Sequence, residues 1–177
     1  NNAGFGSSAD HAINEPFQFK LTATLPASDA RVYDYYKYYK VVFSDTMSKG
    51  LTFDEIESVT IKSGSATKTL TDSDYEYTSK PTTNSFELAI SDVKTLVANL
   101  NSGAEITVLY KAHLNENATV NTANGSNTTE NKNSVYLQYS NNPRIDTSLD
   151  QTPESEVYVF TYQLNNTKYH DDDTPGN

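Results

Sequence analysis

The stretch Asn133-Ser-Val-Tyr-Leu-Gln-Tyr-Ser-Asn-Asn-Pro143 has the pattern of a β-strand that starts at an asparagine and ends in a turn. Side chains of a strand point alternately to its two faces, so Asn133 shares a face with the apolar residues Val135 and Leu137. A second stretch, Phe43-Ser-Asp-Thr-Met-Ser-Lys-Gly-Leu-Thr-Phe53, ends a strand expected over residues 35–45, in which Asp45 shares a face with Phe43. Each strand therefore carries one carboxyl or carboxamide group on an otherwise apolar face.

Burying such a group is costly unless it is paired, so the two residues have two interpretations. In the first, Asp45 and Asn133 form a reactive pair inside the protein. In the second, Asp45 caps the turn before Gly50, and Asn133 begins a strand after a polar loop, as Asp and Asn commonly do. The strand parity alone favours the second interpretation.

Composition narrows the class of protein. The chain has 177 residues, enough for one large domain or for one domain with a tail. Apolar residues make up 36 %, and 13 tyrosines and 7 phenylalanines supply much of the bulk, which favours a sheet protein with a thin core. The formal net charge of −10 argues against a nucleic-acid partner and against an anionic membrane surface, because both need clustered Lys and Arg.

The sequence contains no cysteine, which indicates either an intracellular protein or an exported protein that is stabilised by something other than disulfides. It shows no signal peptide, transmembrane run or sorting signal. The stretch Thr24-Leu-Pro-Ala-Ser28 lacks the apolar tail and basic end that a sortase signal carries. We therefore expect an excised piece of a longer chain.

Patterns of apolar residues predict the secondary structure. Strands are expected over residues 17–25, 35–45, 51–53, 56–61, 75–78, 86–90, 106–112, 133–139 and 156–164. Helical spacing between Ser91 and Gly103 predicts one short helix over residues 91–101, and residues 115–132 are expected to form a long Asn/Thr-rich loop. This order predicts an all-β sandwich with Greek-key connections.

We assign residues 1–164 to this domain, with residues 1–15 as a loop or the remnant of a first strand. Residues 165–177 are expected to form a linker or the start of a following domain.

Several motifs occur in an order that resembles a known family. From Pro16 they read P-F-Q-F-K-L-T-A-T-L-P, then D-T-x-S-K-G-L-T-F, I-T-V-x-Y-x-A-x-L-N-x-N-A, N-x-V-x-L-x-Y-S-N-N-P and T-P-E-x-x-V-Y-V-F-T-Y. Together they resemble the middle, isopeptide-forming domain of Gram-positive sortase-assembled pilin backbone subunits. The resemblance spans residues 9–164 and implies the immunoglobulin-like fold of the collagen-adhesin A type.

The resemblance implies specific chemistry for the two polar residues. In the family, a lysine amine attacks an asparagine side chain, ammonia leaves, and a buried protonated acid assists. Asn133 matches the cross-link acceptor, and Asp45 matches the promoting acid. An apolar surrounding raises the pKa of a carboxyl and lowers that of a lysine, as this reaction requires.

The donor lysine is where this sequence departs from the family. The family places it on the first strand, yet no lysine precedes Lys20, which parity turns toward solvent. Lys40 lies on the outward face, and Lys37 shares the parity of Asp45, so Lys37 is the internal candidate. We expect the true donor to lie N-terminal to Asn1 and therefore expect no internal bond in this chain. Lys168 matches the cross-linking lysine of a following domain.

Other candidate sites have plainer interpretations. The three histidines, His11, His113 and His170, lack the spacing of a zinc site, and Asp171-Asp-Asp173 lacks the Gly and Glu of a calcium loop. No cofactor or metal is expected. Glycosylation patterns at Asn117, Asn124, Asn127 and Asn165 fit chance in an Asn/Thr-rich sequence. The tyrosines of Tyr33-Asp-Tyr-Tyr-Lys-Tyr-Tyr39 could contact a sugar or peptide, but alternating sheet tyrosines explain them more simply.

We therefore expect a structural module of a pilus shaft or fibrillar adhesin, attached to the cell wall of a Gram-positive bacterium as part of a longer protein. Its partners would be neighbouring domains and pilin subunits. The alternative is an adhesin domain that binds a host matrix protein or glycan. No enzyme activity on an external substrate is expected.

Overall fold

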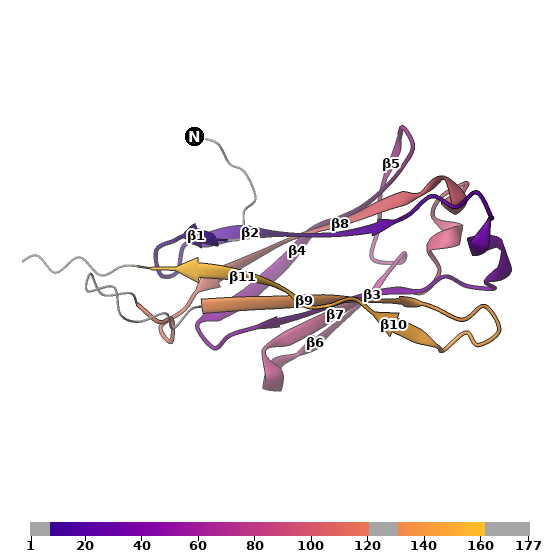
Figure 1. The fold of residues 1–177 in the computed structure, drawn as a ribbon. Helices are drawn as coiled ribbons and strands as arrows, with labels where there is room; N and C mark the ends of the chain where they lie inside the picture. The colour runs from indigo at the N-terminus through magenta and orange to yellow at the C-terminus, as the bar shows by residue number, and fades with distance from the viewer. Residues whose placement is uncertain (1–7, 121–130, 162–177) are drawn as a thin grey trace, which may run out of the picture.

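The computed structural model describes residues 8–120 and 131–161 and forms two facing β-sheets (Figure 1). One sheet has seven strands and the other has four. The expected all-β immunoglobulin-like sandwich is therefore confirmed. No helix in these residues is long and apolar enough to cross a membrane.

The seven-stranded sheet, called sheet A here, has the strand order β1-β11-β9-β3-β7-β6, with β10 paired to β9. Its strands are β1 (Ser8–Asp10), β3 (Val41–Met47), β6 (Glu76–Lys80), β7 (Ser85–Ile90), β9 (Asn131–Ser140), β10 (Leu149–Gln151) and β11 (Ser155–Phe160). Its strand pairs are antiparallel except β1–β11, which is parallel. The two strands singled out in the sequence, β3 and β9, are direct neighbours.

The four-stranded sheet, called sheet B, has the order β2-β8-β4-β5. Its strands are β2 (Pro16–Leu25), β4 (Leu51–Ser63), β5 (Ala66–Thr69) and β8 (Ala104–Leu114). Strand β2 alternates strictly between exposed and buried residues, as its sequence predicts, and Lys20 is exposed. Strand β8 buries every second residue from Ala104 to Leu114.

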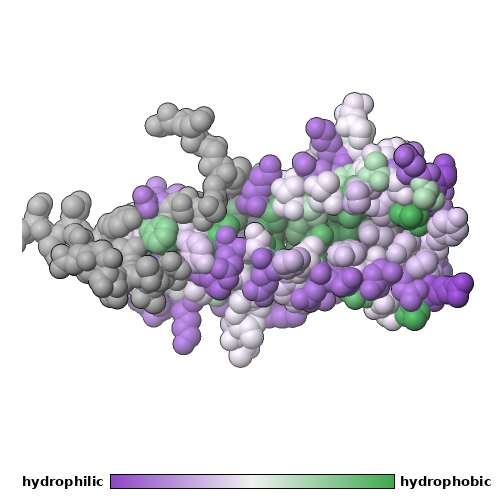
Figure 2. Space-filling view, viewed as in Figure 1, coloured by the Kyte–Doolittle hydropathy of each residue, from purple (hydrophilic) through white to green (hydrophobic). Residues whose placement is uncertain are grey.

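The inward residues of the two sheets form one hydrophobic core. The fully buried side chains include Phe43 and Leu88 of sheet A and Ile106 and Tyr110 of sheet B. Figure 2 shows hydrophilic and near-neutral residues over most of the visible face, with hydrophobic residues in the middle, between the upper and lower layers. The thin, aromatic-rich core expected from composition is therefore what holds the two layers together.

The strand expected over residues 35–45 starts later in the structure than predicted. The strand expected from residue 35 begins only at Val41, because Val32–Tyr35 forms a 3-10 turn. The ring of Tyr39 packs edge-on against Tyr33 and Tyr36, which holds the intervening loop against the core. These tyrosines are therefore not alternating sheet residues, although they divide as expected: Tyr33 and Tyr39 are buried, and Tyr35 and Tyr38 are exposed.

The strands expected over residues 51–53 and 56–61 are a single strand, β4. Its register against β8 shifts between Phe53 and Glu55 and again between Ile56 and Ser58. Each irregularity adds a residue and changes which parity faces inward. The sequence of this one continuous strand therefore has the pattern of two separate strands.

The helix predicted over residues 91–101 is wrong. The segment forms two separate 3-10 turns, Val93–Thr95 and Leu100–Ser102. Asp92 and Asn99 begin these turns, and each side chain accepts a hydrogen bond from the backbone two residues ahead. Such short-range bonds compete with a continuous helix.

A buried asparagine, Asn131, joins the start of β9 to two other segments. Its side-chain amide donates to the carbonyl oxygens of Thr119 and Val159, and its side-chain oxygen accepts from the Thr119 backbone N–H. Gly50, in the turn between β3 and β4, lies directly against it. A Cβ atom at Gly50 would lie 2.2 Å from the Asn131 side-chain oxygen and 2.7 Å from the Cα of Ala118.

We therefore expect Gly50→Ala to destabilise the protein by about 2–3 kcal/mol, because the added methyl must displace Asn131 and break its buried hydrogen bonds. Urea unfolding measures the loss. Gly64→Ala is the matched control: its Cβ meets nothing within 4 Å, so it should lose only about 1 kcal/mol to its left-handed backbone. Equal losses in the two variants would contradict the role of this contact.

Candidate functional site

Asp45 and Asn133 meet inside the sandwich. Asp45 lies on β3 opposite Val135, and Asn133 lies on β9 opposite Met47, so the two residues are diagonal neighbours on the inward face of sheet A. Their exposed fractions are 0 % and 1 %. The Asn133 Nδ2 donates a hydrogen bond of 2.9 Å to the Asp45 Oδ2. The contact between Asp45 and Asn133 that the family resemblance implies is therefore present.

A third residue, Tyr110, reaches the pair from the opposite sheet. Its hydroxyl donates to the Asp45 Oδ2 at 3.0 Å and accepts from the Asn133 Nδ2 at 2.7 Å. Tyr110 lies on β8 of sheet B and is fully buried. We call Asp45, Tyr110 and Asn133 the polar cluster; it joins the two sheets by hydrogen bonds through an otherwise apolar core.

Aromatic rings hold Tyr110 in place. Its ring stacks on Phe19 at a centroid distance of 5.1 Å, meets Phe86 edge-on at 5.2 Å, and packs against Phe53 at 5.8 Å. The three phenylalanines come from three strands, β2, β7 and β4. Because a ring packed from several directions cannot swing away, its hydroxyl stays aimed at Asp45 and Asn133.

Burial also controls the protonation of the cluster. Removal from water raises the pKa of Asp45 to about 7, although its hydrogen bonds from Asn133 and Tyr110 favour the charged form and lower that pKa. Burial and the nearby Asp45 carboxyl raise the pKa of Tyr110 well above its ordinary value. The phenol therefore remains a proton donor at neutral pH, and a substantial fraction of Asp45 is a neutral acid.

Two oxygen atoms of the cluster are left without hydrogen-bond partners among the described residues, namely Asp45 Oδ1 and Asn133 Oδ1. Leaving a buried oxygen without a hydrogen-bond partner is costly. The cluster thus presents a neutral acid beside the nitrogen of a carboxamide, with the carbonyl oxygen of that carboxamide uncommitted. This arrangement suits proton delivery to a departing nitrogen.

The structure does not bring the internal lysine candidate to the cluster. The Lys37 amine lies over the ring of the exposed Tyr38, 4.8 Å from its centroid. Within the described residues, the hydrogen bonds of the Asp45 and Asn133 side chains run only between these two residues and Tyr110. Lys168 lies outside the described residues, so the structure does not place it.

Among the residues that the structure describes, the remaining histidine candidates do not form a metal site. His11 stacks on Phe17 and His113 pairs with Asp54, and no group of three metal-binding side chains occurs in residues 8–120 and 131–161. His170, the run Asp171–Asp173 and the glycosylation patterns at Asn124, Asn127 and Asn165 lie outside that part of the chain.

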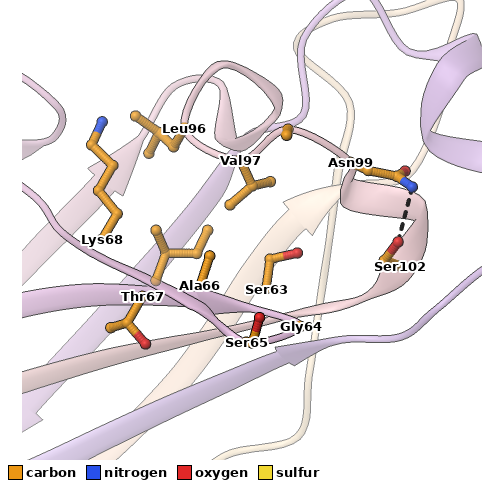
Figure 3. Close-up of a pocket in the computed structure, with 12 residues that line it drawn as sticks. Ser63, Gly64, Ser65, Ala66, Thr67, Lys68, Leu96, Val97, Asn99 and Ser102 are labelled. Carbon is orange, nitrogen blue, oxygen red and sulfur yellow. Dashed lines mark hydrogen bonds between the residues drawn. The ribbon is translucent and has the colours of Figure 1, made fainter.

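A surface groove lies away from the cluster, between the β4–β5 turn and the residues around the 3-10 turns (Figure 3). Leu96 and Val97 line one side, and the Lys68 amine is paired with Asp74 at 3.2 Å. The dashed bond in Figure 3 joins Asn99 to Ser102. The groove offers no buried charge or nucleophile, so it does not compete with the polar cluster as a site of chemistry.

Sequence reasoning missed Tyr110 as a site residue and treated it only as part of a core strand. A signal was present, because its parity placed a tyrosine on the buried face of residues 106–112. A buried tyrosine hydroxyl usually has a hydrogen-bond partner. No sequence pattern indicated that this partner lies across the sandwich.

Residues 27–143 match the family model described as Gram-positive pilin backbone subunit 2, Cna-B-like domain. The expected family is therefore found, although that description names the Cna-B-like type and not the A type. No curated protein sequence matches the chain.

Solved structures show the same fold. The chain is similar to the 35 kDa C-terminal fragment of the major pilin GBS80 of Streptococcus agalactiae, with a TM-score of 0.61 and 21 % identity over 87 % of this chain and 52 % of that one. The pilus 2b backbone protein of group B streptococcus gives a TM-score of 0.62 and 21 % identity, covering 85 % and 53 %. The full-length major pilin SpaD of Corynebacterium diphtheriae gives 0.53 and 24 %, covering 82 % and 32 %. The chain thus spans about half or less of these proteins.

The raised pKa of Asp45 predicts a specific pH dependence. The folded chain keeps a proton that the unfolded chain releases above pH 3.8, so this group's contribution to stability falls as the pH rises from about 4 to about 7. The loss totals on the order of 4 kcal/mol, at about 1.4 kcal/mol per pKa unit. We expect Asp45→Asn to remove this dependence.

Urea unfolding of both proteins between pH 4 and pH 8 measures the difference in the free energy of unfolding. The exposed Asp29→Asn is the control, and it should follow the wild-type curve. A constant difference between wild type and Asp45→Asn across this range would refute the raised pKa.

Proposed function

The chain belongs to the Gram-positive pilin backbone family, and from that membership we propose that it is a structural domain of a pilus shaft, of the type closed by a Lys–Asn isopeptide bond. The observation that carries the proposal is the 2.9 Å contact between the buried Asp45 and Asn133. Both residues lie within residues 27–143, the part of the chain that the family model matches.

The proposed reaction uses groups already held in place. A neutral lysine amine attacks the Cγ of Asn133, and the carbonyl electrons move to Oδ1. When the carbonyl re-forms, the Cγ–Nδ2 bond breaks, and the nitrogen leaves as ammonia with a proton from Asp45. The new amide nitrogen returns a proton to the Asp45 carboxylate. The net change is an amide bond and one ammonia, with Asp45 regenerated.

We propose that the donor lysine lies N-terminal to Asn1. Strand β1 starts at Ser8, which pairs with Tyr158 of β11, and Tyr158 pairs with Lys132, the neighbour of Asn133 on β9. Strand β1, the first described strand, therefore runs beside β11, which pairs in turn with the acceptor strand β9.

Such a bond suits a domain under tension. It would join the chain before β1 to β9, closing a loop of more than one hundred residues, which by analogy with disulfides restricts the unfolded chain by about 4–5 kcal/mol. The absence of cysteine is consistent with this stabiliser. On this proposal the chain is the middle domain of a longer protein on the cell wall of a Gram-positive bacterium, and its partners are neighbouring domains and other pilin subunits.

A second candidate function, an adhesin domain, has one supporting observation. Tyr35 and Tyr38 are 73 % and 46 % exposed, and exposed aromatic rings commonly contact sugars and proteins. Binding to immobilised collagen or to a glycan array, lost on Tyr35→Ala and Tyr38→Ala, would favour it. A shaft domain should show no such saturable binding.

Intact-mass measurement tests the cross-link. We expect the 177-residue chain to have the mass of its sequence, and a natural chain extended upstream to the donor lysine to be lighter by one ammonia, about 17 Da. Asp45→Ala and Asn133→Ala should each keep the full mass in the extended chain. Asn117→Ala, an exposed asparagine, is the control and should react normally.

An extended chain with the full mass would overturn the proposed cross-link. An ammonia loss in the 177-residue chain would instead assign the donor to an internal lysine, and Lys37→Arg would identify Lys37 if it abolished the loss. The extended and short chains should also differ in melting temperature. Equal melting of a cross-linked and an open form would show that the bond does not stabilise the domain.

A further inference from the structure

We propose that Tyr110 is a third working residue of the site, which holds the Asn133 amide nitrogen beside Asp45 and relays the proton with which that nitrogen leaves. The inference rests on the proposed cross-linking function. It assigns a role to a residue on β8, which neither carries Asn133 nor neighbours its strand in the sheet.

The Tyr110 hydroxyl contacts the Asn133 Nδ2, the atom that leaves as ammonia. Its hydroxyl lies 2.7 Å from the Asn133 Nδ2, a shorter contact than the 2.9 Å between that nitrogen and Asp45 Oδ2. The same hydroxyl lies 3.0 Å from Asp45 Oδ2. The three atoms thus form a nearly equilateral triangle, in which the phenol touches both the acid and the leaving group.

This triangle fixes which end of the carboxamide faces the acid. Nδ2 is hydrogen-bonded to both Asp45 and Tyr110, whereas the Asn133 Oδ1 has no partner among the described residues. With a single partner the amide could rotate about its Cβ–Cγ bond, but two partners on the same atom resist that rotation. Tyr110 therefore keeps the leaving nitrogen, and not the carbonyl oxygen, against the acid.

A proton relay through the Tyr110 phenol leaves both Tyr110 and Asp45 with the protons they started with. In the starting carboxamide, the lone pair of Nδ2 is delocalised into the carbonyl and cannot accept a proton. Once the lysine has added to Cγ, Nδ2 becomes a tetrahedral amine whose lone pair can accept the Tyr110 proton, while the phenol oxygen takes the proton of the Asp45 carboxyl. Ammonia then leaves, Tyr110 is again a phenol, and Asp45 regains its proton from the newly bonded lysine nitrogen.

The residues around Tyr110 favour its role as a proton relay. Phe19, Phe53 and Phe86 pack on its ring from three strands and fix the hydroxyl position. Their apolar faces also exclude water, which strengthens each hydrogen bond of the polar cluster. A phenylalanine at position 110 would keep all of this ring packing and lose only the hydroxyl.

The test follows ammonia loss over time in the natural chain that carries the donor lysine, made by cell-free synthesis and quenched at intervals for intact-mass measurement. We expect Tyr110→Phe to slow cross-linking by about 10–100-fold. Because the phenol lowers the pKa of Asp45, the variant should also move the midpoint of the pH–rate profile to higher pH, which a loss of packing alone would not do.

Tyr33→Phe is the matched control. Tyr33 is also a buried tyrosine, and its hydroxyl donates to the Pro26 carbonyl at 2.9 Å, outside the polar cluster. This variant should cross-link at the wild-type rate. A Tyr110→Phe variant that reacts as fast as wild type would overturn the role of Tyr110 while leaving the proposed function intact. A wild-type chain that never loses ammonia would instead overturn the proposed function, and the relay with it.

A second measurement needs no variant. In the 177-residue chain, the Tyr110 hydroxyl proton should exchange slowly with water and show a nuclear Overhauser effect to the side-chain amide protons of Asn133. A hydroxyl proton that exchanges rapidly, or one without this contact, would refute the placement of Tyr110 even if Tyr110→Phe failed to fold.

Discussion

The hydrogen bonds that Asp45 shares with Asn133 and Tyr110 constrain the rest of this structure. They place a carboxyl group in the middle of an apolar core, at 0 % exposure, and join β3 and β9 of sheet A to β8 of sheet B. A buried acid is tolerated only where its partners are held in place. The neighbouring strands β3 and β9 must therefore keep their register, because a one-residue slip of either would turn Asp45 or Asn133 to the outside.

The aromatic residues around the polar cluster offset the energetic cost of burying it. Phe19, Phe53 and Phe86 enclose Tyr110 and supply the burial that holds the two sheets together. The same burial raises the pKa of Asp45 to about 7, so near neutral pH the acid can remain uncharged. Packing and protonation thus have one cause, which is the exclusion of water from the space between the sheets.

A stable fold does not by itself require a neutral acid beside an asparagine, since apolar residues of similar size would fill the space without loss. Packing alone therefore does not account for the polar cluster. A covalent bond between strands would more than offset the cost of burying the cluster and would replace the disulfides that the sequence lacks. The buried polar cluster is thus the feature of the core that the proposed cross-link would account for.

The sequence by itself determined the inward faces of β2, β3, β8 and β9, because strand alternation is local and survives in any sandwich. It therefore placed Asp45 and Asn133 correctly on buried faces. It missed the bulges of β4, which reverse parity, and the pair of 3-10 turns near Asp92, where side-chain capping defeats helical spacing. Only the tertiary structure decided that Tyr110 joins the cluster, because that contact crosses between sheets and depends on how three separate strands pack around its ring.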